Sequence, residues 1–557
     1  MPGKVLTSAK RRRARFAAAA LGTIGYATAA QSCLAAASSE VLERLKALEQ
    51  TIETQQRQIE TQQRQIEAER AEIDTLKAEL LASEPETEKS AVAVAAGTVV
   101  PAPSETALAV QPKPEDVRWR LEGGRPSVSA GDYSFAVRGR VQLDAAAYFQ
   151  DKAGPLSTNW RRGSIDGGRE NIAATDLSSG TNFRRAQLGI EGRLGKHLGY
   201  RILPEFGSTG AETNPRLHEG WLSYTGVPDW TLQAGAFPPP ANLDDSGSAD
   251  DTLFLERATP AELSRSLAGA DGRVSAGASG HGRRWFAAFH LTGATFAEGE
   301  SFDEQVAVVG RLAGLAFTGR DYNVHAGING SYVMQPTDSG GGATSFRYIR
   351  FRDEPELRVD STRLIDTGQI QAESAYAAGV EFAANWRNLT FQAEAFRYGI
   401  GLASSSVQQD NPHFSAWYAQ ASYVLAGQRR QYDIQTGAYG APRPILASDG
   451  AAIRGALELA ARYSHTDLNF HAGSPGSPPP PGGIRGGVQD NWSVGFNWYP
   501  TPNTKFMFDY QHISVDRLNP ASPTDPEPFG SGDATPPIGV QIGQTLQTLS
   551  IRTQYSF

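Results

Sequence analysis

The sequence predicts an all-β protein: a 16-stranded antiparallel transmembrane β-barrel over residues 116–557, preceded by an N-terminal α-helical coiled coil. Three observations lead to this prediction. The last fourteen residues alternate apolar and polar side chains and end with the aromatic residues Tyr555 and Phe557. Segments with the same period of two recur along the chain, separated by connections that alternate between short and long. No apolar run reaches the ~20 residues that a membrane-spanning helix needs.

Residues 1–37 have the pattern of an export signal. Several Lys and Arg residues precede the apolar run Phe16–Ala30, and small residues follow it. We expect cleavage between Ala29 and Ala37. This cleavage removes six Lys and Arg residues and no acidic residue, so the formal charge changes from −8 to −14. An anion path through such a chain would need its positive charge to be concentrated locally.

Residues 38–82 form a heptad pattern. Apolar residues recur every seven positions, and the heptad IETQQRQ occurs twice, at 52–58 and 59–65. The Ile-rich core positions favour a three-stranded coiled coil, and the polar Gln residues between them fix its register. The alternative is a single solvated helix, which would leave a stripe of Ile exposed. Residues 83–115 are rich in Ala, Pro, Thr and Val, which is typical of an extended linker.

From residue 116 onward we count about sixteen segments with period two. One face of each is apolar and aromatic, and the other is polar or charged. The segments begin near residues 133, 183, 199, 217, 230, 273, 284, 305, 321, 376, 389, 414, 455, 491, 504 and 545.

Short turns on one side and long loops on the other indicate an outer-membrane barrel with both termini in the periplasm. The alternative, a soluble β-sandwich, has no reason to alternate its loop lengths in this way. One connection, 426–454, should be short and is long. A barrel of sixteen strands leaves a lumen too wide for the strands' side chains to fill, so an aqueous channel is the expected product.

Several stretches resemble the phosphate-selective porin O/P family. They include TNFRRAQLGIEG at 181–192, TLFLERATP at 252–260, WYAQASYVLAGQRRQYDIQTGAYG at 417–440 and ARYSHTDLN at 461–469. LIDTGQI at 364–370 and NLTFQAEAF at 388–396 lie between them in family order. The final strand also resembles the C-terminal signal of outer-membrane barrels, which the barrel assembly machinery would read through Tyr555 and Phe557.

The resemblance implies a trimeric porin of the bacterial outer membrane whose long loops fold inward, including a periplasmic segment. That segment would account for connection 426–454. The resemblance also implies an anion or phosphate path lined with Arg and Lys. This chain departs from the family by carrying four carboxylates in the expected constriction loop, which we expect to weaken phosphate selectivity: Asp244, Asp245, Asp250 and Asp251.

Alternation of side chains selects the candidate pore-lining residues. Leu188, Ile190 and Leu194 should face lipid, which places Arg185 and Arg193 in the lumen and Arg184 on the outside. The same argument places Arg138 and Arg140 in the lumen.

Two loops supply further candidates. Arg257 and Arg265 lie in loop 238–272, where the alternative is pairing with Glu256 or the Asp cluster. Arg347, Arg350 and Arg352 lie in loop 335–375, where the alternatives are a solvated outer loop or contact with lipopolysaccharide. Arg suits phosphate because its planar guanidinium bonds two oxygens at once.

We find no pattern for an enzyme, a cofactor, a metal site or nucleic-acid binding. The nine His residues show no metal-ligand spacing, and none lies beside a nucleophile motif. The sequence therefore predicts an outer-membrane porin for small hydrophilic solutes that favours anions. The alternatives are a non-selective porin of the same fold, and a barrel-anchored tether whose coiled coil contacts peptidoglycan.

Overall fold

The computed structural model describes residues 117–122, 124–151, 177–207, 216–295, 303–340, 345–404, 406, 410–445, 455–520 and 538–557. All of them belong to a compact unit that covers Ala109–Phe557. The predicted signal peptide (1–37), coiled coil (38–82) and linker (83–115) lie outside the described residues and stay predictions.

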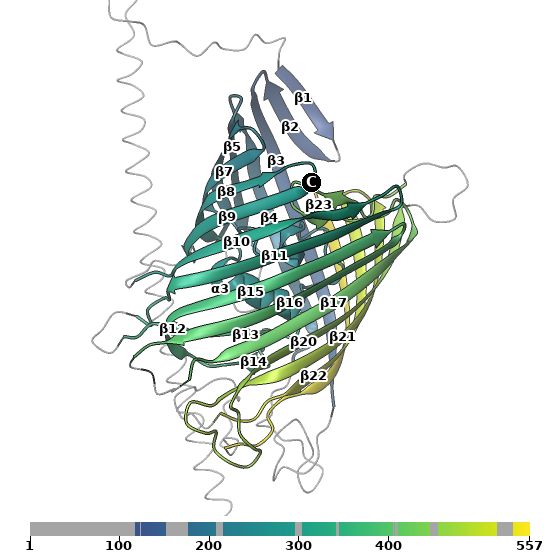
Figure 1. Ribbon diagram of the computed structural model, residues 1–557. Coiled ribbons are helices and arrows are strands. Elements are labelled where there is room, and N and C mark those ends of the chain that lie inside the picture. The colour runs from purple at the N-terminus through teal and green to yellow at the C-terminus, as the bar shows by residue number, and fades with distance from the viewer. Residues whose placement is uncertain are drawn as a thin grey trace, which may run out of the picture. The chain divides into compact units, whose positions relative to one another are not determined.

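Within the described residues, sixteen antiparallel strands form one closed barrel (Figure 1). They are β3 (Tyr133–Gln150), β4 (Gly180–Leu194), β5 (Leu198–Glu205), β6 (Arg216–Val227), β7 (Trp230–Ala236), β8 (Arg273–His281), β9 (Trp285–Thr295), β10 (Val306–Thr318), β11 (Tyr322–Gln335), β15 (Ile370–Trp386), β16 (Leu389–Leu402), β17 (His413–Ala426), β20 (Ala456–Phe470), β21 (Ile484–Thr501), β22 (Thr504–Asp516) and β23 (Thr545–Ser556).

The barrel closes where the last strand pairs with the first. β23 and β3 are antiparallel from Leu546 opposite Gln150 to Ser556 opposite Arg140. Beyond β23, the backbone of Phe557 exchanges two hydrogen bonds with Gly139, at 2.9 and 3.0 Å. A Cβ atom at Gly139 would lie 2.4 Å from the Phe557 ring, so only glycine leaves room for that ring. The C-terminal aromatic residue therefore packs directly onto the closing seam.

The predicted count of sixteen strands is confirmed. Fourteen strands begin within three residues of the predicted positions, whereas β15 and β21 begin six and seven residues earlier. The predicted faces of the final strand are also confirmed. Leu549 and Ile551 are exposed on the outside, and Ser550, Arg552 and Gln554 are buried inside. This alternation is the pattern of a wall between lipid and lumen.

A hairpin that the sequence did not predict precedes the barrel. β1 (Val117–Glu122) pairs with β2 (Arg125–Ala130), and β2 pairs with the first residues of β3. β23 pairs with β3 only from Arg140 onward, and β4 occupies the other edge of β3. β2 therefore pairs with the start of β3 on the same edge as β23. The hairpin thus continues the sheet past the end of the closing strand.

Three segments fold into the barrel. The first carries α2 (Leu243–Ser246) and α3 (Thr259–Ala268), the second carries β12 (Tyr348–Ile349), β13 (Arg352–Asp353) and β14 (Ile365–Asp366), and the third carries β18 (Tyr432–Asp433) and β19 (Ala438–Tyr439). The third segment is the long connection 426–454. Its described residues fold inward, as the family resemblance implied.

The infolded segments build an apolar core inside the barrel. Leu263 and Leu267 of α3 and Phe351 of the second segment pack with inward residues of the wall, such as Tyr398 and Phe414. The lumen is therefore not open across its full width. Sixteen strands are too wide for their own side chains, but the infolded loops bring enough apolar residues to fill one part of the lumen.

No helix within the described ranges is long and apolar enough to cross a membrane.

Candidate functional site

A polar chamber of about 450 Å³ lies inside the barrel, beside the apolar core. One wall comes from the inner faces of β3 to β9, and the other comes from the first infolded segment between Phe237 and Asp271. Its charged and imidazole groups are Arg138, Arg140, Arg185, Arg201, His218, Glu219, Asp245, Arg257, Arg265, Asp271 and His290.

Arginines outnumber carboxylates in the chamber lining, whereas the chain as a whole is acidic. Six arginines line the chamber against three carboxylates, whereas the whole chain has a formal charge of −8. A charge inside a confined water column acts on a passing ion at short range, while salt screens charges more than ~8–10 Å away. The local excess of arginine therefore matters more to an ion in the chamber than the charge of the chain.

Three of these arginines are held tightly by carboxylates. Arg140 contacts Asp250 at 2.7 Å, and Arg265 contacts Asp245 at 2.6 Å. Arg201 contacts Glu219 at 2.8 Å, and its guanidinium also lies over the ring of Trp221. Guanidiniums in such short ion pairs have few donors left for a ligand.

The other three are held loosely. Among the described residues, the closest carboxylate oxygens lie 3.8 Å from Arg138 (Glu191), 3.5 Å from Arg185 (Asp271) and 3.5 Å from Arg257 (Asp245). Contacts of this length are at or beyond the limit of a hydrogen bond. Arg138 is also the most exposed of the three, with 28% of its side-chain surface accessible. These three guanidiniums have the most capacity to bind a passing anion.

Buried ion pairs fix the first infolded segment against the wall. Glu256 accepts hydrogen bonds from Arg184 at 2.6 and 3.0 Å and from Arg552 at 2.9 Å, and Arg358 lies 3.6 Å away. Burial raises the pKa of Glu256, but attraction to Arg184 and Arg552 outweighs it and leaves the pKa well below its usual value. A single carboxylate thus links three guanidiniums, from β4, β23 and the second infolded segment.

The helices of this segment begin where the sequence provides the right groups. Pro260 stands in the first turn of α3, where a missing N–H costs nothing, and Arg265 stands near its negative C-terminal end. Asn242 caps α2 through its side chain. The buried Glu394 of β16 accepts hydrogen bonds from the backbone N–H groups of Leu243 and Asp244, which ties α2 to the wall.

The prediction that Arg184 faces outward is wrong. In the pairing of β3 with β4, Gln142 lies opposite Arg185 and Leu143 lies opposite Phe183, so Arg184 is the extra residue of a β-bulge. A bulge turns two consecutive side chains toward one face. Both arginines are consequently buried inside the barrel, at 5% and 4% exposure.

The remaining candidates divide between the chamber and the surface. Arg138, Arg140, Arg185, Arg257 and Arg265 all line the chamber. Arg257 and Arg265 also pair with Asp245, which is the alternative that the sequence left open.

The other four candidates are not among the residues that line the chamber. Arg193 is exposed beside the turn after β4. In the second infolded segment Arg347 pairs with Asp303 at the surface, Arg350 pairs with Asp366, and Arg352 is exposed.

Sequence reasoning missed several residues at the chamber. Arg201 and Glu219 line it, and they lie on strands to which the alternation argument applies equally well. His218 also lines it, but it is the extra residue at a register shift of β6, which alternation does not predict. The contacts between Glu256 and the arginines of β4 and β23 could not be predicted from a local sequence pattern, because the partners lie 72 and 296 residues away in the chain. No group of three metal-ligating side chains is found in the described part of the chain.

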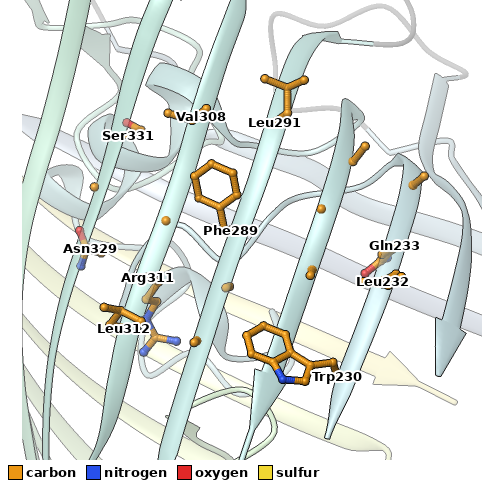
Figure 2. A pocket seen from close by; sticks show the side chains of 18 of the residues that line it. Trp230, Leu232, Gln233, Phe289, Leu291, Val308, Arg311, Leu312, Asn329 and Ser331 are labelled. Atoms are coloured by element: carbon orange, nitrogen blue, oxygen red, sulfur yellow. The ribbon is translucent and has the colours of Figure 1, made fainter. Parts of the chain in front are cut away.

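A second concavity, of about 1220 Å³, lies on the outside of the barrel. Figure 2 shows Trp230, Phe289, Leu291 and Leu312 on the neighbouring strands that form it. Between these large residues the face carries small ones, including Ala234, Ala276, Ala278, Ala287, Gly310, Gly330 and Ala378. This face is apolar and hollowed, and Gln233 is the lining residue that it shares with the chamber.

Comparison with known proteins matches a family model described as phosphate-selective porin O and P to residues 163–557. An uncharacterized protein of Caulobacter vibrioides is 25% identical over 447 residues, which cover 77% of each chain.

Solved structures that the comparison found include an anion-selective porin from Comamonas acidovorans, with a TM-score of 0.40 and 9% identity, covering 76% of this chain and 100% of that one. OmpT, an outer membrane protein of Vibrio cholerae, has a TM-score of 0.40 and 10% identity, covering 77% and 99%. The outer membrane channel DcaP of Acinetobacter baumannii has a TM-score of 0.38 and 11% identity, covering 76% and 97%.

Proposed function

Because this chain belongs to the phosphate-selective porin O and P family, we propose that it forms a water-filled channel that prefers small anions. It is a β-barrel of the bacterial outer membrane. The observation that carries the proposal is the chamber lining, in which six arginines face three carboxylates. Among the described residues, three of those arginines, Arg138, Arg185 and Arg257, have no carboxylate oxygen closer than 3.5 Å.

Conduction requires groups that replace part of an ion's hydration shell and then release the ion. A guanidinium can donate two N–H groups to the oxygens of phosphate or of a carboxylate. Arg138 is accessible to water, and Arg185 and Arg257 lie further inside with loosely placed counter-charges. An anion can therefore pass between several moderate sites without being trapped at a single strong one.

Small oxyanions of the phosphate or polyphosphate type are the solutes that this lining fits best. The Asp cluster opposes them less than the sequence suggested, because two of its members already have partners. Asp245 is paired with Arg265 and Asp250 with Arg140. Their negative charge is largely neutralised before an anion arrives.

A non-selective channel of the same fold is the second candidate. It is favoured by the fact that each of the six chamber arginines has a carboxylate oxygen within 4 Å. A structural tether to the cell wall is the third, and the apolar core that fills part of the lumen favours it. The coiled coil that would contact peptidoglycan lies outside the described residues.

Liposome swelling separates the channel from the tether. Liposomes that contain the purified full-length protein should swell in an isosmotic solution of a neutral pentose, because the chamber admits water and small hydrophilic solutes. Liposomes with the protein should swell many times faster than liposomes without it. Swelling at the rate of empty liposomes would contradict a channel and favour the tether.

We further propose that three copies assemble through the hollowed outer face on β6 to β11. Small residues there would allow neighbouring barrels to approach closely, as small residues do between helices in lipid. The rest of the outer surface would contact membrane lipid and lipopolysaccharide. Tyr555 and Phe557, at the seam, would be the residues that the barrel assembly machinery reads.

A further inference from the structure

Three aromatic rings adjoin one another on the outside of the barrel, on the neighbouring strands β17, β20 and β21. Trp417 and Trp492 are 42% and 61% exposed. The ring of Tyr463 lies between them, with its centroid 5.2 Å from that of Trp417 and 4.4 Å from that of Trp492. The three rings therefore form one continuous aromatic surface that faces away from the lumen.

A hydrogen-bonded polar pair lies beside these rings. Nδ1 of His465 is 2.8 Å from Oδ1 of Asp490, and the hydroxyl of Tyr463 donates to the same oxygen. Strand pairing places His465 opposite Trp417 on one side and opposite Asp490 on the other. The two side chains are 31% and 38% exposed. Within the described residues, Oδ2 of Asp490 and Nε2 of His465 have no hydrogen-bond partner, so both atoms are available to a ligand.

On one side of this patch the outer surface is apolar. Two residues beyond Trp492 along β21, Val494 lies opposite Tyr510, which lies opposite Leu549, and all three are exposed. A charged group that faces the hydrocarbon of a membrane is costly, whereas aromatic rings favour the headgroup level. The apolar row therefore faces hydrocarbon, and the polar pair lies in the headgroup layer.

On the other side of the patch the surface stays polar. Arg397 of β16 lies opposite Ser415 of β17, which lies opposite Asp467 of β20. Arg397 is exposed and has no ion pair within the described residues. At this end residues 471–483 join β20 to β21, whereas residues 502–503 join β21 to β22 at the opposite end. Long connections are extracellular in outer-membrane barrels, so the patch belongs to the outer leaflet.

The chemistry of the patch differs from that of an ordinary aromatic belt, which needs rings alone. Here an exposed guanidinium and a His–Asp pair stand beside the rings. Neighbouring strands are about 4.8 Å apart, so Arg397 is two strand spacings, roughly 10 Å, from the strand of His465. The patch lies on β16 to β21 and the hollowed outer face on β6 to β11, so assembly through the hollowed face leaves the patch open to lipid.

We propose that this patch binds the anionic disaccharide headgroup of one lipopolysaccharide molecule in the outer leaflet. Trp417 and Trp492 pack against the apolar faces of the sugar rings, His465 and Asp490 hydrogen-bond hydroxyl groups, and Arg397 binds an anionic substituent. Phospholipid headgroups lack sugar rings and would leave the aromatic surface without a matching partner. The inference rests on the proposed contact with lipopolysaccharide and gives it a place, and it does not depend on whether the channel prefers anions.

The test is a titration of the full-length protein in detergent with bis-phosphorylated lipid A, followed by native mass spectrometry. In the double variant Trp417→Ala, Trp492→Ala, we expect the dissociation constant to rise at least about tenfold, because aromatic anchors carry much of the free energy of an interface. Arg397→Gln should raise it about fivefold for bis-phosphorylated lipid A and leave it unchanged for the dephosphorylated form. The second variant keeps the test decisive if the first folds poorly.

The matched control is the double variant Trp386→Ala, Trp498→Ala. Both residues are exposed on the outside, near short turns at the opposite end of the barrel. We expect this control to keep the wild-type dissociation constant within about twofold. An equal rise in both double variants would overturn the site, as would an Arg397→Gln variant that binds both forms of lipid A like the wild type.

Two further measurements separate other occupants of the patch. Displacement of lipid A by an equal concentration of phosphatidylglycerol would overturn the proposal, because it would show a surface for any anionic lipid. Loss of the oligomer in Trp417→Ala, Trp492→Ala would overturn it as well, because the patch would then be a contact between copies. Liposome swelling by the same variants reports on the channel alone, so unchanged swelling with unchanged lipid binding refutes the site and not the porin.

Discussion

Replacing Glu256 by alanine is expected to destabilise the barrel by about 3–5 kcal/mol, because breaking a buried charge network leaves uncompensated charges behind. Glu256 is the common partner of Arg184, Arg552 and Arg358. Arg552 retains Asp144 as a second partner, at 2.6 Å. Among the described residues, Glu256 is the only carboxylate within ion-pair distance of Arg184. Most of the lost free energy of unfolding therefore comes from leaving Arg184 buried without a counter-charge.

The free energy of unfolding, measured in denaturant on the refolded barrel, checks this expectation. Glu373→Ala is the control, because Glu373 is exposed on β15 and its removal should change the free energy by less than about 0.5 kcal/mol. The Glu256 variant should also show noisier single-channel current, since the segment that forms one chamber wall loses an anchor. A loss of stability no larger than that of Glu373→Ala would show that the segment is held by its apolar core alone.

Replacing Arg138, Arg185 and Arg257 together by glutamine is expected to lower the anion-to-cation permeability ratio about tenfold at low salt. Each of these groups acts on an ion within a few ångströms in a confined path, where Coulomb energies exceed those in bulk water. The effect should weaken as salt is raised, because the Debye length falls to ~3 Å at 1 M. Reversal potentials at several salt concentrations measure both trends.

The control for this triple variant removes the same charge elsewhere. Arg193, Arg347 and Arg387 are exposed and do not line the chamber, so their replacement by glutamine should leave the ratio nearly unchanged. A fall of equal size in the control would mean that selectivity follows total charge. The chamber arginines would then have no special role.

Much of this fold could be predicted from the sequence because side chains in a barrel wall alternate between two solvents. In the last strand, apolar Leu549 and Ile551 alternate with polar Ser550 and Arg552. Only one orientation of the strand turns the apolar residues to lipid and the polar residues to the lumen. The alternating loop lengths indicated an outer-membrane barrel, and consecutive barrel strands are neighbours around it. The inward position of Arg138 and Arg140 followed from the same alternation.

The alternation argument failed where a β-bulge interrupts the period of two along a strand. The bulge at Arg184 shifts one residue of β4, and nothing in the sequence TNFRRAQLGIEG marks it as a bulge. The inward side chains of β16, Phe396 and Tyr398, are apolar, so the alternation there does not separate the two faces. They are buried because an infolded loop covers them. Which loops fold inward depends on contacts such as Glu256 with Arg552, which join distant parts of the chain.

The ion pairs that the Asp cluster forms with arginines could not be predicted from the sequence either. Asp250 and Arg140 are 110 residues apart, and only the closed barrel brings them within 2.7 Å. Without that geometry, four Asp residues in one loop indicate repulsion of anions. With it, Asp245 and Asp250 neutralise the tightly held arginines and leave Arg138, Arg185 and Arg257 with loosely placed counter-charges.

The reversal potential of the wild-type channel in a potassium chloride gradient shows whether the chamber selects anions. With the full-length protein in a planar bilayer at low salt, the chamber arginines should make chloride more permeable than potassium. The potential should then take the sign of an anion-preferring pore and move toward zero as salt is raised. A potential at zero, or of the cation-preferring sign, would contradict the account and leave the arginine-lined chamber without the function proposed for it.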